Sequence, residues 1–336
     1  WRLPRWKWAS AQRGSLASAR LNAASAASGW LRRRHRFATT LLALTRQYLC
    51  DWDGLDALHA RIAADIATGI PAGDAANPFA TLAMPVEPAI QQLAAASWAR
   101  FWQPATTLPP VTPRPATGRR LRLGYLSTDF REHPITALLG EVWARTDRAR
   151  FETFAYSIGP PDASALRRRV EASFDHFVDC HREVPRATAA RIRADRIDIL
   201  VDLNGHAPAG RPLVVARKPA PLVVEWLDYF DTTGMRVVDY LLTDPYTTPE
   251  GSPQRFVETP YRLPHTRFCY APPAAAPAVA PAPAALRGYV TFGSFNRQDK
   301  LHPALVGCWA RILRAVPGAR LLLKNRALQI PAVRAA

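Results

Sequence analysis

The chain has 336 residues, of which 48% are hydrophobic, so it can bury the cores of two ordinary domains and is not wholly disordered. No uninterrupted apolar run reaches about 18 residues, which argues against a membrane-spanning helix. The start of the chain has no signal-peptide pattern. The net charge of +17 raises the question of nucleic-acid binding.

The positive charge is almost entirely arginine and is concentrated at the start of the chain. The first fifty residues contain ten basic residues and no acidic one. No RNP, zinc-finger or helix-turn-helix pattern accompanies this charge. We therefore expect no specific nucleic-acid binding.

The four cysteines are far apart and form no CxxC pair: Cys50, Cys180, Cys269 and Cys308. A disulfide framework or a zinc site would need closer, repeated spacing. The wide spacing of the cysteines favours a reducing, cytoplasmic setting.

The first third of the chain predicts helices followed by a boundary. Residues 1–40 are basic and rich in Ala and Ser, with no assignable fold. Apolar residues three and four apart predict a helix over 41–66 and another over 88–101. The proline-rich stretch 106–120 should be extended and exposed. We place the first segment at 1–117.

From residue 121 short apolar runs alternate with helical patterns. Strands are predicted at 121–127, 151–158, 174–180, 197–203, 221–227 and 238–244, and helices at 135–145, 163–172 and 187–194. Such alternation indicates parallel pairing with right-handed crossovers. The sequence therefore predicts an α/β domain over 118–270 with one doubly wound parallel sheet.

A low-complexity Ala/Pro stretch, residues 271–286, is predicted to be a linker. Residues 287–336 then predict the start of a second Rossmann-like domain: strand 289–295, helix 303–316 and strand 319–325. A lone βαβ unit buries too little surface to be stable by itself. It must pack onto the first domain, or the rest of its domain is missing.

Ligands of open α/β sheets bind beyond the carboxyl ends of the strands. Four loops follow predicted strands there: 127–134, 204–211, 227–234 and 296–300. They carry His133, His206 and Lys300, which suit acid-base or phosphate chemistry. Each also has an ordinary structural interpretation, as a loop cap, a packed histidine or a surface lysine.

Acidic residues in the same loops leave two interpretations open. Asp129 could orient His133 or cap the following helix. Asp228 and Asp231 could bind a cation or an acceptor, or cap turns. No GxGxxG or P-loop motif occurs, so a dinucleotide or P-loop site is not indicated.

Six segments in order carry a recognisable pattern: LRLGYLSTDFREHP, RFETFAYSIGPPD, ADRIDILVDLNGH, KPAPLVVEWLDYFDTTG, VDYLLTDPYTTP and VTFGSFNRQDKLHPALVGCWARILRAVPGARLLLKN. From about Leu121 to its end the chain resembles the catalytic region of protein O-GlcNAc transferases of bacterial type. In this family tetratricopeptide repeats precede a GT-B glycosyltransferase. The segment LTRQYLCDWDGLDAL resembles the helical connection between these two parts.

The resemblance implies inverting, metal-independent transfer of N-acetylglucosamine from UDP-GlcNAc to Ser or Thr of acceptor proteins. No metal and no cofactor is expected besides this donor substrate. By the motif match, His133 occupies the position of the family's active-site histidine and Lys300 that of the lysine on the donor diphosphate. The family's general base is unsettled, so His133 could instead position the acceptor or sugar. Further substrate contacts are expected from Asp129, Asn204, His206, Thr232, Thr233 and Asn296.

The chain departs from the family pattern at several positions. Where the family commonly has WLGYPGTTG, residues 226–234 include Asp228, Phe230 and Asp231, and Asp299 stands where a tyrosine is common in some members. The family's later His-Thr-Thr loop and its uracil and ribose contacts are absent. No tetratricopeptide repeat is recognisable in 1–117.

These departures, with Trp1 in place of an initiator Met, favour a fragment of a longer enzyme that by itself neither transfers sugar nor binds the donor tightly. Two alternatives stay open: a relative that uses another nucleotide sugar, such as GDP-fucose, and a non-catalytic protein-binding remnant.

Overall fold

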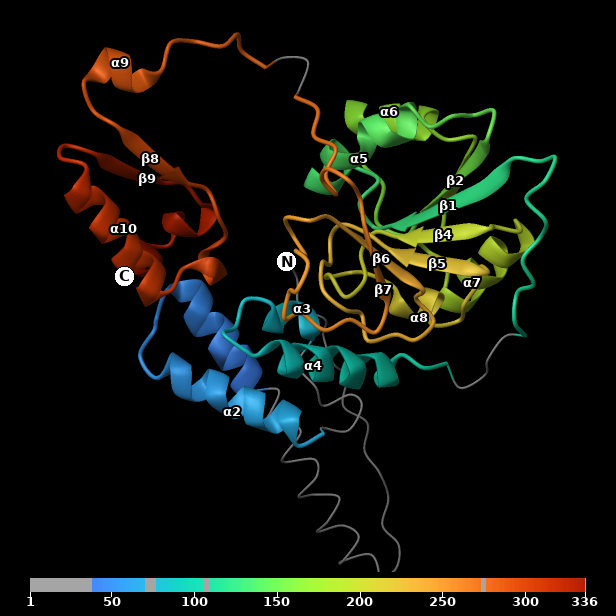
Figure 1. The fold of residues 1–336 in the computed structure, drawn as a ribbon, viewed down its shortest axis with the longest axis horizontal. Coiled ribbons are helices and arrows are strands. Elements are labelled where there is room, and N and C mark those ends of the chain that lie inside the picture. Colours follow the sequence, from blue (N-terminus) through green and yellow to red (C-terminus); the bar gives the residue numbers. More distant parts are fainter. Residues whose placement is uncertain (1–37, 70–76, 105–108, 273–275, 336) are drawn as a thin grey trace, which may run out of the picture.

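The computed structural model describes residues 38–69, 77–104, 109–272 and 276–335. The basic segment 1–37, and parts of the proline-rich and Ala/Pro stretches, lie outside these residues. Figure 1 shows a group of N-terminal helices, a large sheet covered by helices, and a small two-stranded unit. No helix in the described ranges is long and apolar enough to cross a membrane.

The N-terminal group contains a helix over 38–49, α2 (Leu55–Ala67), α3 (Pro78–Thr81) and α4 (Pro88–Phe101). The helix expected over 88–101 is confirmed. The single helix expected over 41–66 is wrong, because the chain turns at Cys50 and Gly54, whose φ angles are 56° and 64°. Left-handed backbone of this kind ends an α-helix.

A seven-stranded parallel sheet forms the centre of the molecule, in the order β3-β2-β1-β4-β5-β6-β7. Its strands are β1 (Leu121–Ser127), β2 (Phe151–Ser157), β3 (His176–Asp179), β4 (Ile199–Asp202), β5 (Leu222–Glu225), β6 (Tyr240–Thr243) and β7 (Thr259–Arg262). Every pair in the sheet is parallel. The predicted α/β fold class is therefore confirmed.

Helices cover both faces of this sheet because the strands are apolar on both sides. On one face Tyr125 and its neighbours pack against α5 (Pro134–Ala144) and α6 (Ala165–Ala172). On the other, Leu126 and its neighbours pack against α7 (Pro185–Ala194), α8 (Pro212–Val215) and the end of α4. Alternate residues of one strand therefore supply two separate cores.

The last strand of the sheet, β7, was not predicted. Its sequence is TPYR, which lacks an apolar run and contains Pro260. Proline removes a backbone donor and is tolerated at the edge of a sheet. The strand pairs with β6 alone, so it occupies such an edge.

The second unit pairs β8 (Thr291–Ser294) with β9 (Arg320–Leu323) in parallel, across α10 (Pro303–Ala315). Its other elements are α9 (Pro283–Arg287), η1 (Gln298–Lys300), η2 (Arg326–Gln329) and α11 (Pro331–Ala335). The expected βαβ unit is thus present, although α9 occupies the end of the segment expected to be a pure linker.

This unit packs on the N-terminal helices. Ala327 and Val333 form a buried cluster with Cys50, and Leu49 and Trp52 pack against it. The Gln47 side chain also donates a hydrogen bond to the Asp299 carbonyl. The N-terminal helices therefore connect the two sheets. The exact domain boundaries stay a prediction.

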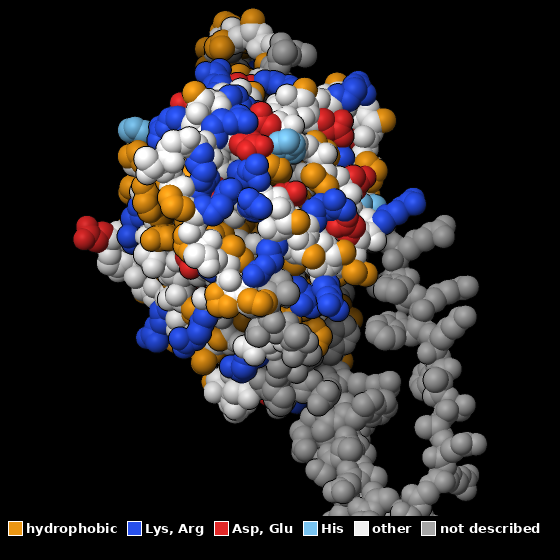
Figure 2. Space-filling model, turned by 90° about the vertical axis from the view of Figure 1, so that its right-hand side faces the viewer, with side chains coloured by type: hydrophobic (Ala, Val, Ile, Leu, Met, Phe, Trp, Pro, Cys, Tyr) orange, Lys and Arg blue, Asp and Glu red, His pale blue; other side chains and the backbone are white. Residues whose placement is uncertain are grey.

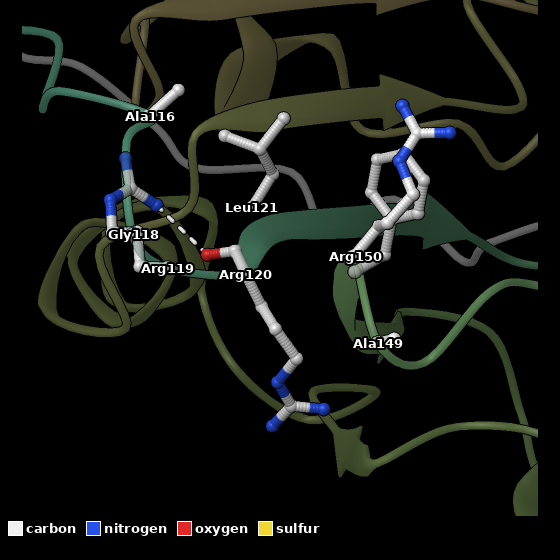
Figure 3. Close-up of a pocket in the computed structure, with 8 residues that line it drawn as sticks. Ala116, Gly118, Arg119, Arg120, Leu121, Ala149 and Arg150 are labelled. Carbon is white, nitrogen blue, oxygen red and sulfur yellow. Dashed lines mark hydrogen bonds between the residues drawn. The ribbon is translucent and has the colours of Figure 1, made fainter.

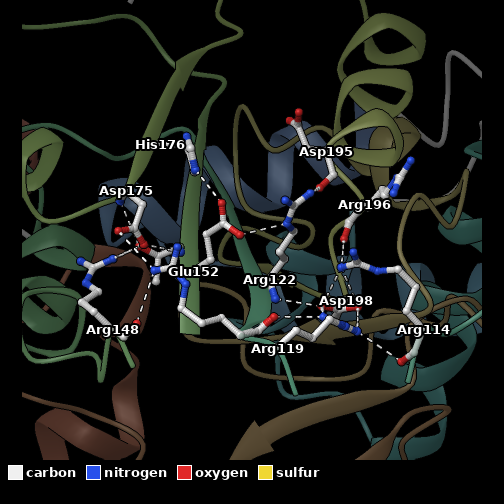
Figure 4. A network of polar contacts seen from close by, with 12 residues as sticks. Arg114, Arg119, Arg122, Arg148, Glu152, Asp175, His176, Asp195, Arg196 and Asp198 are labelled. Atoms are coloured by element: carbon white, nitrogen blue, oxygen red, sulfur yellow. Dashed lines mark hydrogen bonds and ion pairs between the residues drawn. The ribbon is translucent and has the colours of Figure 1, made fainter. Parts of the chain in front are cut away.

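The amino edge of the large sheet carries a polar network. Asp198 accepts hydrogen bonds from the guanidinium groups of Arg114 and Arg119, and Arg122 continues the network to Glu152 (Figure 4). Lys and Arg side chains are spread over this side of the molecule, with acidic side chains among them (Figure 2). The arginines of this network are therefore paired with carboxylates of the fold.

A hollow of about 520 Å³ lies at the same edge, lined by Ala116, Gly118, Arg119, Arg120, Leu121, Ala149, Arg150 and Phe151 (Figure 3). These residues come from the amino ends of β1 and β2. Since the predicted chemistry belongs at the carboxyl ends, this hollow is separate from the candidate active site.

Candidate active site

The strand order creates a topological switch point between β1 and β4. The chain moves outward from β1 to β2 and β3, then returns to add β4 on the other side of β1. The two following loops diverge there, which is where open α/β sheets bind ligands. The loops that follow β1, β4 and β5 carry the candidate residues.

His133 lies directly after the β1 loop and caps α5. Its Nδ1 accepts a hydrogen bond from the Ile135 N–H at 3.4 Å. Burial lowers the pKa of His133, and Arg131 lowers it further, while Asp129 opposes both effects. The imidazole is therefore neutral at pH 7. Because Nδ1 accepts, the proton of this neutral ring lies on Nε2.

Asp129 and Asn204 connect the loops after β1 and β4. The Asn204 side-chain nitrogen donates to Asp129 Oδ2 at 2.8 Å, and its side-chain oxygen accepts from the Thr128 N–H at 2.8 Å. The Thr128 hydroxyl also donates to Asp129 Oδ2. Arg131 donates to Asp129 Oδ1 at 3.2 Å, and the distance from Oδ1 to His133 Nδ1 is 3.7 Å.

Asp228 extends this arrangement to the loop after β5. Its backbone N–H donates to the Leu203 carbonyl at 3.3 Å, which ties the loop to the end of β4. Burial and the nearby charge of Asp129 raise the pKa of Asp228, a hydrogen bond from Asn204 lowers it, and the result is about 6. Side chains from three adjacent strands thus meet at the carboxyl edge.

Three other predicted site residues lie beneath this surface. The His206 ring is only 3% exposed, contacts Tyr229, and has Nε2 2.6 Å from the Thr233 carbonyl. Burial lowers the pKa of His206 to about 4. Thr232 and Thr233 are buried, and both hydroxyls donate to Glu258.

His133 and His206 therefore lie at the same edge of the sheet, as predicted, but only His133 is accessible. The His206 ring is buried under the loop after β5. Thr232 and Thr233 likewise stabilise that loop rather than face outward. Sequence spacing places residues on a loop but does not tell which of them it buries.

Lys300 lies in the second unit, at the end of η1, and is exposed. Its ammonium makes no hydrogen bond or ion pair with the described residues. Asn296 precedes it, and its carbonyl accepts from the Asn325 side chain at 2.7 Å. Arg297, in the same loop, forms an ion pair with Asp299 and acts electrostatically on Asp228. The charge of Arg297 in the second unit therefore acts on the loop after β5.

Sequence reasoning missed Arg267, which supports the loop after β5. Its side chain is 3% exposed, donates to the Leu227 carbonyl at 2.7 Å, and lies over the rings of Phe230 and Phe268. The residues around Arg267 form no motif that indicates this role, because Leu227 and Phe230 lie about forty residues earlier in the chain.

Together the doubly wound sheet, the second α/β unit and the site at the switch point define a GT-B-like α/β protein. Residues 108–271 match the family described as Glycosyl transferase family 41.

Two curated relatives are "Probable UDP-N-acetylglucosamine--peptide N-acetylglucosaminyltransferase" proteins. SPINDLY of Oryza sativa is 36% identical over 209 residues, 61% of this chain and 22% of its own length. SEC of Arabidopsis thaliana is 30% identical over 300 residues, 83% of this chain and 31% of its own length. A solved mutant O-GlcNAc transferase of Thermobaculum terrenum matches with a TM-score of 0.75 at 31% identity, covering 89% of this chain and 57% of that one. This chain thus spans less than a third of these curated relatives.

Proposed function

We propose that the protein containing this chain transfers N-acetylglucosamine from UDP-GlcNAc to Ser or Thr hydroxyls of proteins, with inversion. The observation that carries the proposal is the group of polar side chains at the switch point of a family 41 fold, with neutral His133 at its centre. The printed names of the relatives support the donor and the peptide acceptor.

His133 suits a role as hydrogen-bond donor in this reaction. Its Nε2–H is free of the capping interaction, so it can donate to an oxygen of the sugar or acceptor. The N-cap bond keeps the ring in one orientation. Such preorganised donors stabilise charge as it develops during transfer.

Lys300 is suited to stabilise the leaving group. The UDP diphosphate gains negative charge as the bond to the sugar breaks, and an unpaired ammonium can stabilise it as a point charge. A cation in this position makes transfer without a metal chemically reasonable. We propose such metal-independent chemistry, with protein acceptors and a UDP-sugar as the only partners required.

We expect Lys300→Ala to lower kcat in the full-length protein by about 10²-fold or more, as loss of one electrostatic stabiliser typically does. Mass spectrometry of a Ser-containing peptide incubated with UDP-GlcNAc measures transfer. Arg314→Ala, which removes an exposed cation from α10 of the same unit, is the control and should retain activity.

Parallel reactions with excess EDTA and with GDP-fucose test the metal and the donor. Transfer that stops with EDTA would contradict metal independence. Transfer from GDP-fucose alone would replace the proposed donor, and no transfer from any nucleotide sugar would contradict the proposed function.

A further inference from the structure

The amino edge of the large sheet carries a concave, positively charged surface that the proposed transfer reaction does not use. The hollow of about 520 Å³ described above lies there, and none of its lining residues is acidic. In Figure 3 the guanidinium groups of Arg119 and Arg150 lie on either side of Leu121. Alanine, leucine and phenylalanine side chains supply the apolar part of the lining. This amino-edge hollow therefore combines separated cations with apolar surface between them.

The inner arginines at this edge are held by carboxylates of the fold (Figure 4). Asp198 accepts hydrogen bonds from the guanidinium groups of both Arg114 and Arg119. Arg122 forms an ion pair with Glu152 at 3.0 Å. These bonds connect the start of β1 with the strands on either side of it, so the structure itself accounts for these arginines.

Two arginines of the hollow have little compensating charge. Arg150 is exposed and forms no ion pair with any described residue, and its guanidinium carbon lies 5.4 Å from the centre of the Phe151 ring. Arg120 is also exposed, donates to the Arg148 carbonyl at 3.3 Å, and lies 4.0 Å from Asp175. That carboxylate already forms a closer ion pair, of 2.7 Å, with Arg148. Arg120 and Arg150 can therefore pair with an anion from outside.

One acidic side chain lies next to the hollow. Asp147 is exposed on the turn before β2, and its carboxylate accepts from the N–H of the lining residue Ala149 at 2.9 Å. This carboxylate stabilises the turn. Its charge lowers the positive potential beside Arg150, three residues further on.

The placement of the cations indicates what kind of anion fits. A single phosphate group is best held by donors that converge on it. Here the guanidinium groups are separated by apolar side chains, which matches a chain that carries several carboxylates on short apolar stems. The Lys and Arg side chains spread over this side of the molecule would also attract such a chain from solution (Figure 2). The hollow thus suits an acidic peptide segment.

We propose that the amino-edge hollow binds an acidic segment of the acceptor protein and acts as a docking site away from the transfer site. This inference rests on the proposed function, which makes proteins the acceptors. β1 has seven residues, and a strand rises about 3.3 Å per residue, so the hollow lies about 20 Å from the loops at the carboxyl edge. A docked acceptor therefore needs a stretch of chain between its acidic segment and the Ser or Thr that receives the sugar.

Docking of this kind raises the local concentration of the acceptor hydroxyl and leaves the chemical step unchanged. It should lower KM for long acidic acceptors and leave kcat as it is. Short acceptor peptides, which cannot reach from one edge of the sheet to the other, should gain nothing.

The test uses the full-length protein and two synthetic acceptor peptides. Each has the same Ser-containing sequence and a Gly/Ser linker of about 20 residues, which extends over roughly 20–25 Å on average. One ends in hexaglutamate and the other in hexaglutamine. We expect KM to be about five- to tenfold lower for the hexaglutamate peptide at equal kcat, since exposed ion pairs are individually weak. The double variant Arg120→Ala/Arg150→Ala should remove this preference.

Two further variants test whether the position of the charge matters. Arg311→Ala/Arg314→Ala removes two exposed arginines from α10 and should keep the preference. Asp147→Asn removes the negative charge beside the hollow, retains an oxygen for the Ala149 N–H, and should strengthen the preference. Equal loss of the preference in both double variants would mean that binding follows net charge, which would overturn the proposed docking site.

A binding measurement separates this proposal from the proposed function, because it needs no transfer. Fluorescence anisotropy of the labelled hexaglutamate peptide should give a Kd that rises with salt, and rises about five- to tenfold in Arg120→Ala/Arg150→Ala. An unchanged Kd in this variant overturns the docking site, whether or not the protein transfers sugar. Binding without transfer from any nucleotide sugar overturns the proposed function and leaves the hollow as a site for acidic segments. Tighter binding of a uridine oligonucleotide of equal charge, lost in the same variant, would make nucleic acid the occupant and overturn the assignment to a protein segment.

Discussion

Glu225, at the carboxyl end of β5, is fully buried, and neither of its side-chain oxygens has a hydrogen-bond partner among the described residues. Burial raises the pKa of Glu225 well above its usual value, and the charges of Asp202 and Glu258 raise it further. The folded protein therefore keeps this carboxyl protonated to a higher pH than the unfolded chain does. The unfolded chain ionises it above about pH 4.3.

This difference makes stability depend on pH, and we predict that Glu225→Gln removes the dependence. Above the unfolded pKa the unfolded chain releases a proton that the folded protein retains, so the free energy of unfolding falls as pH rises. The slope is about 1.4 kcal/mol per pH unit until the folded pKa is reached. The stability gained by Glu225→Gln should therefore increase with pH between the unfolded and the folded pKa of Glu225.

Urea unfolding of both proteins at pH 6, 7 and 8 measures this gain. The difference between the two proteins is the informative quantity, because His206, with its pKa lowered to about 4, contributes the opposite slope to both near pH 6. Parallel stability curves for the two proteins would show that Glu225 is ionised in the fold.

At the scale of single elements, the sequence predicted what depends on local pattern. The strands over 121–127 and 151–158 were found from apolar runs, and the start of α5 from Pro134. The break at Cys50 was missed because a left-handed cysteine leaves no signature in the apolar spacing. The tautomer of His133 was also out of reach, since it depends on the geometry of one backbone N–H.

The end of α7 gives a prediction at this scale. Arg196 follows the C-cap Asp195 with a φ angle of 53°, and it is exposed. Glycine is the preferred residue at this position, because a Cβ costs about 1–2 kcal/mol in left-handed backbone. We expect Arg196→Gly to stabilise the protein by about 0.5–1 kcal/mol, the entropy that glycine adds to the unfolded chain offsetting part of the gain.

Thermal unfolding measures this effect. Arg193→Gly, inside α7, is the matched control and should destabilise the protein by about 1 kcal/mol, because glycine is unfavourable within a helix. Equal effects of the two substitutions would mean that Arg196 does not adopt the left-handed conformation in solution.

At the scale of the whole molecule, the site depends on contacts that no local pattern contains. Asp228 and Arg297 are nearly seventy residues apart and belong to different units, yet the charge of Arg297 lowers the pKa of Asp228. The sequence suggested that the second unit packs on the first domain or lacks its remaining parts. In the structure its buried apolar contacts are instead with Leu49, Cys50 and Trp52, at and just after the end of the helix over 38–49. Packing partners of this kind depend on shape, which apolar spacing does not encode.

The amides of the second unit should consequently be the least protected from hydrogen exchange in the fold. The contact of this unit with the N-terminal helices should determine how readily it opens. Its main helix, α10, buries no residue, whereas α5 and α7 bury several. Few buried apolar contacts mean a low free energy of local opening. We therefore expect amides of residues 287–335 to exchange faster with deuterated water than those of β1, β4 and β5.

Val333→Asp should accelerate this exchange further, because it puts a charge into the cluster formed with Cys50 and Ala327. Val306→Asp, at an exposed position on α10, is the control and should change little. Hydrogen-exchange mass spectrometry resolves the two units in one experiment. If Val333→Asp leaves the exchange of residues 287–335 unaffected, the N-terminal helices do not hold the second unit.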